Sequence, residues 1–124
     1  MFQLLFWLYL VNAVLLITHE IDSAYWKEWD LFKLPGDITG FLLIHLPILF
    51  LVLYGLVLVF QDSILGLWLS LLLSIAGVFA FAIHTFFINR GRTEFKTPVS
   101  LSLLVAMLAV SLAQTAVTIC LLIT

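Results

Sequence analysis

The sequence predicts an all-α integral membrane protein, a four-helix up-down bundle whose first helix is extended by an interfacial amphipathic segment. Of its 124 residues, 65% are hydrophobic and only 10% are charged, whereas soluble domains are about 45–50% apolar and 25% charged. The mean hydropathy is +1.26. Apolar runs long enough to cross a bilayer, about 17–25 residues each, recur along the chain. Short links join them, which favours antiparallel neighbours within a single transmembrane domain, 1–124.

The first span is predicted at about 2–18. Neither Gly nor Pro follows until Pro35, so the helix is expected to continue through residues 23–32. Trp26 and Trp29 in this extension are suited to the aromatic belt that lies at lipid headgroups. The extension is therefore expected to lie at the membrane interface.

Three further spans are predicted at about 38–60, 64–88 and 99–123. The turn before the second span contains Pro and Gly, and Asp37 is expected to be the N-cap of that helix. A very short polar turn joins the second and third spans into a tight hairpin. The longest polar stretch, 89–98, is expected to be the loop before the fourth span.

The three histidines of the chain all fall near the ends of predicted spans. His19 follows the first span, His45 lies early in the second, and His84 lies late in the third. Because the crossings alternate in direction, these three positions are expected at the same membrane face. An ionisable side chain within a span is costly and is therefore a functional hypothesis by default.

The basic residues follow the same pattern. The side opposite the histidines carries only Asp62 and the chain ends, whereas the histidine side carries every Lys and Arg. By the positive-inside rule the histidine side is expected to be cytoplasmic and both termini non-cytoplasmic. The basic residues in question are Lys27, Lys33, Arg90, Arg92 and Lys96.

The helical repeat indicates which carboxylate lies on the same helix face as His19. Asp22 is three residues after His19 and shares its face, whereas Glu20 is turned about 100° away and is expected to be an interfacial group. Neutral imidazoles with one carboxylate suit zinc or ferrous iron, and three protein ligands with an open position are typical of catalytic sites. The predicted metal ligands are His19, Asp22, His45 and His84, with zinc or iron as the cofactor.

If such a site is catalytic, the natural chemistry is attack of a metal-activated water on a lipid-borne ester or amide. Glu20 and Glu94 are the candidate catalytic residues, as acceptors of the water's proton. The alternative is structural: the same polar groups hydrogen-bond one another and tie three helices together, at about 0.6–2 kcal/mol per contact. A further alternative is contact with haem, chlorin or quinone, although no haem attachment motif is present.

Besides a metal-dependent hydrolase, an accessory subunit and a transporter are two other roles, and they differ in what they require of the sequence. A non-catalytic accessory subunit of a larger respiratory or photosynthetic membrane complex, or a homo-oligomer, requires only lipid-like outer faces. A transporter is disfavoured, because four helices are few and no polar pair is expected at mid-membrane depth. The net charge of −2 gives no basic face, so the bilayer is the expected partner and nucleic acid is not.

These residues also carry a resemblance. The chain resembles a group of small four-helix bacterial membrane proteins without assigned activity, whose motifs appear here as Thr18-His19-Glu20-Ile21-Asp22, His45-Leu46-Pro47 and His84, followed by Glu94-Phe95. The resemblance implies a multi-pass protein of the bacterial inner membrane. A related group carries His-x-x-Glu-Glu, whereas this chain has Asp22-Ser23 at those positions, so a role that needs the glutamate pair does not carry over.

Overall fold

The structure is a computed structural model that describes residues 1–92 and 96–124. Four long helices and one short helix make up the described part of the chain, which contains no strand. The four long helices are long and apolar enough to cross a membrane, which makes the protein a multi-pass membrane protein and confirms the predicted fold class. The helices are α1 (Phe2–Tyr25), α2 (Glu28–Leu31), α3 (Asp37–Phe60), α4 (Ile64–Asn89) and α5 (Pro98–Ile123).

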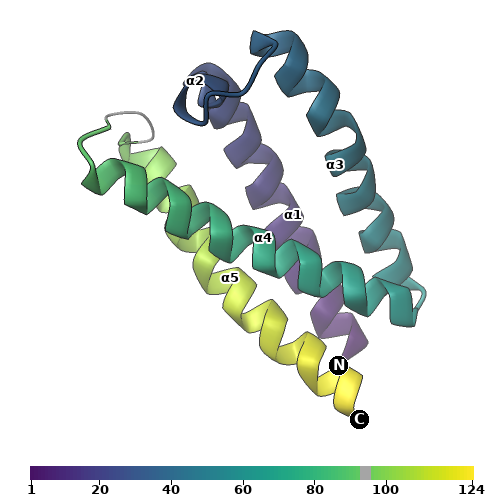
Figure 1. The fold of residues 1–124 in the computed structure, drawn as a ribbon. Helices are drawn as coiled ribbons and strands as arrows, with labels where there is room; N and C mark the ends of the chain where they lie inside the picture. Colours follow the sequence, from purple (N-terminus) through teal and green to yellow (C-terminus); the bar gives the residue numbers. More distant parts are fainter. Residues whose placement is uncertain (93–95) are drawn as a thin grey trace.

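Helix α1 is the centre of the bundle. It packs against α3, α4 and α5, whereas α3 and α5 do not contact each other in the described residues. Both chain ends lie at one end of the bundle, and α2 lies at the other, beside the start of α3 (Figure 1). The three histidines lie on the elements that meet at the α2 end, as alternating crossings predict.

The expected continuous helix through residues 23–32 is wrong, because α1 ends at Tyr25 and α2 folds back across the end of the bundle. Lys27 between them has a left-handed backbone, with φ of 54°, which costs about 1–2 kcal/mol. Trp29 and Leu31 become buried in return, and the Trp29 ring centroid lies 5.6 Å from that of Phe41. Burying each such side chain contributes about 1.5–3 kcal/mol, so the folded-back chain is favoured.

The predicted N-cap of the second span is also wrong. Gly36 occupies the cap position of α3 and Asp37 is the first helical residue, with no side-chain cap hydrogen bond. The chain passes through this cap with φ of 97°, a backbone that glycine adopts without the steric cost a side chain would bring. The turn geometry therefore decides the residue at the cap.

A fully buried polar layer ties α1, α4 and α5 together near the middle of the bundle. The Asn12 side-chain nitrogen donates to Ser111 Oγ at 3.0 Å and to Gln114 Oε1 at 2.9 Å. The Gln114 nitrogen donates in turn to the carbonyl oxygen and Oγ of Ser70 at 3.0 and 2.9 Å. The expectation of no polar pair at this depth is therefore wrong. Such contacts contribute about 0.6–1.7 kcal/mol each and fix helix packing.

Helix α3 is attached differently, through α1. The Tyr9 hydroxyl donates to the Val52 carbonyl at 2.8 Å, and Gly55 lies directly against the same hydroxyl, leaving no room for a side chain. No residue of α3 joins the buried polar layer described above. Helix α3 is thus held to α1 by this hydrogen bond and by apolar packing along its length.

Candidate metal centre

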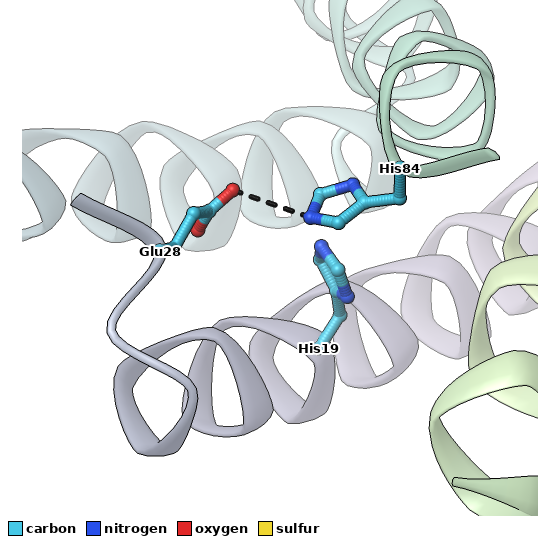
Figure 2. Close-up of side chains that lie close together, drawn as sticks. All are labelled: His19, Glu28 and His84. Carbon is cyan, nitrogen blue, oxygen red and sulfur yellow. Dashed lines mark ion pairs between the residues drawn. The ribbon is translucent and has the colours of Figure 1, made fainter. Parts of the chain in front are cut away.

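His84 is the best-defined member of the site. It lies on α4 with only 2% of its surface exposed, and its Nδ1 lies 2.7 Å from the carbonyl oxygen of Ala80. Because a carbonyl only accepts hydrogen bonds, Nδ1 carries a hydrogen and, in the neutral ring, Nε2 carries the lone pair. Nε2 faces Glu28 on α2, with 3.4 Å between Nε2 and Oε1 (Figure 2).

His19 completes the group from α1. Its side chain is 1% exposed, and its ring lies edge-on to that of His84, with 4.6 Å between the ring centroids. Figure 2 shows a ring nitrogen of His19 directed at the His84 ring. One ligand atom each from His19, Glu28 and His84 lies within 4.8 Å of the other two. We call these three residues the open cluster.

The distance between His84 and Glu28 indicates what the open cluster suits. A charge-assisted hydrogen bond from nitrogen to carboxylate is about 2.7–2.9 Å long, and 3.4 Å exceeds this range. Two ligand atoms that share a tetrahedral zinc ion, at 2.0–2.1 Å each, are about 3.3–3.4 Å apart. The spacing is thus that of an ion pair without a short hydrogen bond, and it is also the separation expected of two ligands of one ion.

The electrostatics favour a charged Glu28. Burial raises the pKa of the Glu28 carboxyl, but the contact with His84, the charge of His84 and the nearby Ser23 hydroxyl outweigh this effect and hold the pKa below its usual value. Only 12% of the Glu28 side chain is exposed. An ionised carboxylate in so dry a setting is the form that binds a cation.

A second histidine–glutamate pair lies next to the open cluster. His45 Nε2 is 2.6 Å from Glu20 Oε2, and His45 Nδ1 is 2.7 Å from the Phe41 carbonyl. Since Nδ1 carries its own hydrogen, the contact with Glu20 holds one further proton between the two groups. Glu20 also interacts electrostatically with Glu28 and His84. We call His45 and Glu20 the closed pair.

In the structure, the four predicted ligands do not form one group. His19 and His84 lie together as expected, but His45 is bound to Glu20 and the carboxylate of the cluster is Glu28. Asp22 Oδ1 accepts a hydrogen bond from Trp26 Nε1 at 3.0 Å. The charge of Asp22 still interacts with His19, so it lies beside the cluster without being one of its three members.

Glu28 is the residue that the sequence reasoning missed. On a continuous helix Glu28 would lie nine residues beyond His19, about 13.5 Å along the axis and on the opposite face. Because the helix ends before Lys27 and the chain folds back, neither this distance nor the opposite face separates Glu28 from His19. The alternation of apolar Trp29 and Leu31 with charged Glu28 and Asp30 is the signal that one side of this segment folds onto the bundle. Glu94, the other candidate catalytic residue, lies outside the described residues.

The chain matches a known protein family. The family of unknown function DUF6713 matches residues 5–121, nearly the whole chain. No curated protein and no solved structure matches the chain. The predicted motif pattern and the relation to the His-x-x-Glu-Glu group stay predictions. The extent of the family match shows that the chain belongs to DUF6713.

Proposed function

We propose that the protein is a metal-binding membrane protein whose open cluster holds one divalent cation, zinc or ferrous iron. The observation that carries this proposal is the geometry of His84 and Glu28. The Nδ1 hydrogen of His84 is bound to a backbone carbonyl, and its Nε2 faces a buried carboxylate across 3.4 Å. A histidine that ligates a metal typically donates its other N–H to such a carbonyl or carboxylate.

The donor set of the open cluster also supports binding of a cation. Two imidazoles and a carboxylate are the ligands of many catalytic zinc sites and of non-haem ferrous sites, both of which keep open positions. A bound cation would also compensate the buried charge of Glu28, which is costly at the end of a membrane-spanning bundle. The charge of Asp22 also interacts with His19, so Asp22 is an additional acidic group beside the cluster.

The chemistry that suits these residues is hydrolysis of an ester or amide in a lipid-like molecule. A bound zinc or iron ion would lower the pKa of a water and polarise a carbonyl. The closed pair is adjacent and already holds a shared proton, so Glu20 and His45 are suited to accept and return a proton during such a reaction. Glu94 stays a candidate for the same role.

The orientation belongs to the same proposal. All five basic residues lie in the links at the histidine end of the chain, which supports a cytoplasmic site in a bacterial inner membrane. A reporter enzyme that is active only in the cytoplasm, fused to the C-terminus, should be inactive. Reporter activity comparable with that of a cytoplasmic control would contradict this orientation.

Elemental analysis of the purified protein tests the metal. We expect about one equivalent of zinc or iron per chain, as one three-ligand site requires. His84→Ala should lose this metal. His45→Ala is the matched control, because it removes an imidazole at the same end of the bundle but from the closed pair. Absence of metal after reconstitution of the wild-type protein, or equal loss from both variants, would contradict the proposal.

A further inference from the structure

An apolar cavity of about 280 Å³ lies between α1, α3 and α4. Leu16 lies on its α1 wall, Ile48 on its α3 wall and Leu73 on its α4 wall. Leu51 and Leu72, which also line it, are 45% and 56% exposed, so the cavity opens to the surroundings of the bundle. For a membrane-spanning bundle those surroundings are lipid chains.

On each of the three helices, the cavity wall leads towards the polar site. Glu20 lies one turn beyond Leu16 on the same face of α1, and His45 lies one turn before Ile48 on α3, so the closed pair stands about 4.5–6 Å above the cavity wall. On α4, Ala76 lines the cavity, and His84 lies two turns further along the same face. The apolar cavity and the histidine site are therefore stacked along the bundle.

We propose that this cavity binds the acyl chain of a single lipid molecule and directs the polar head of that lipid to the closed pair and the open cluster. The inference deepens the proposed function, on which it rests for the chemistry of the head group. It identifies the substrate class as a lipid carrying an ester or amide group next to its chain, and a fatty acid as the corresponding product.

The lining favours hydrocarbon over a polar ligand. The one side-chain hydroxyl on the wall, that of Tyr9, is already bound to the Val52 carbonyl. All the other lining side chains are aliphatic. A cavity of about 150 Å³ with such a lining takes up benzene in other proteins, and this cavity is larger.

The size disfavours a helix of a second protein or a second copy of this chain. One turn of an α-helix is about 5.4 Å long and at least 10 Å wide with its side chains, so only single side chains of a neighbouring helix fit within about 280 Å³. A hydrocarbon chain is the narrowest of these ligands, and the exposed side chains of Leu51 and Leu72 at the edge of the cavity are apolar as well. The cavity therefore suits one hydrocarbon chain.

Photolabelling of the purified protein in phosphatidylcholine nanodiscs tests the inference. The probe is palmitic acid with a diazirine in mid-chain, present in trace amounts, and labelled residues are mapped by mass spectrometry. We expect labels concentrated on the cavity wall. Ala76→Phe, which places a larger side chain on the cavity wall, should lower this labelling about tenfold, equivalent to 1.4 kcal/mol of binding free energy. Ala109→Phe, the same exchange at an exposed position of α5, should leave it unchanged.

The metal content of the same samples separates this inference from the proposed function. Loss of cavity labelling in Ala76→Phe with its metal retained supports both. Cavity labelling in a wild-type protein that takes up no metal supports chain binding and refutes the metal site. Labels spread evenly over exposed residues such as Phe79 and Val105, and insensitive to Ala76→Phe, overturn the inference whatever the metal content.

Discussion

The open cluster and the closed pair use the same two residue types at the same end of the bundle, yet their geometries differ. In the closed pair, the imidazole and carboxylate are 2.6 Å apart and 16–18% exposed. In the open cluster, they are 3.4 Å apart, and the histidine is 2% exposed. In both, the Nδ1 of the histidine is bound to the carbonyl four residues earlier, so the difference lies in how far the glutamate reaches.

The position of each glutamate explains this difference. Glu20 is on α1 itself and faces the start of α3, so its contact with His45 forms as the two helices pack. Glu28 is on α2, whose position depends on the burial of Trp29 and Leu31. A carboxylate held by a separate element can stay at a metal-ligand distance without collapsing onto its histidine. The geometry of the closed pair therefore suits holding α1 against α3 and sharing a proton, whereas the geometry of the open cluster suits binding of an ion.

The largest effect that separates the two groups is stabilisation by zinc. At a free zinc concentration of 100 times Kd, binding to the folded state adds about 2.7 kcal/mol to the free energy of unfolding. Glu28→Gln should abolish most of this increase, because it removes a charged ligand. Glu20→Gln should keep it. Unfolding in detergent micelles with zinc and with chelator measures both.

The two glutamine variants are matched in chemistry and in membrane depth. If Glu20→Gln removes the zinc effect as completely as Glu28→Gln does, the open cluster is not the binding site. If neither variant responds differently from the wild type, the ion binds elsewhere and the comparison between the two groups loses its meaning.

The contribution of the closed pair to the free energy of unfolding should be clearest in protein without metal. In Glu20→Leu, the His45 Nε2 loses its partner in a largely buried setting, and an unsatisfied group of this kind costs about 1–3 kcal/mol. In Glu20→Gln, the amide nitrogen can donate to the same Nε2, so the loss should be about 1 kcal/mol or less. Unfolding of chelator-treated samples gives both values. Equal losses in the two variants would show that hydrogen bonding contributes little there.

The dependence of stability on pH should be a smaller effect than the loss of the closed pair. It should come from Glu28 of the open cluster. The pKa of Glu28 in the folded protein lies below its ordinary value of 4.5, so its ionisation stabilises the fold above that value. This contribution is lost as pH falls through the lowered pKa. In chelator-treated protein, the difference in stability between wild type and Glu28→Gln should therefore be constant at neutral pH and vanish in acid. A difference that grows on acidification would contradict the direction of this pKa shift.

The sequence was sufficient for the spans and for the meeting of His19 with His84, because hydropathy and alternating crossings depend only on composition and connectivity. It was insufficient for Glu28, because the helix break at Lys27 carries no Gly or Pro and is decided by the burial of Trp29 and Leu31. Likewise, the helical repeat of α1 alone placed Glu20 at the interface. The repeat of one helix does not indicate which residue of another helix faces it, here His45 on α3.

The smallest effect concerns Asp22, the ligand that helical phase favours. Asp22 Oδ1 accepts a hydrogen bond from Trp26, and Asn keeps an oxygen for this bond, so Asp22→Asn should change stability by less than about 1 kcal/mol, the typical net worth of one hydrogen bond. Its zinc-dependent stabilisation should match the wild type, because the three members of the open cluster remain. Calorimetric titration with zinc in micelles is the measurement. A tenfold or greater loss of zinc affinity in Asp22→Asn would make Asp22 a fourth ligand, which requires its carboxylate to turn from Trp26 towards His19 when the ion binds.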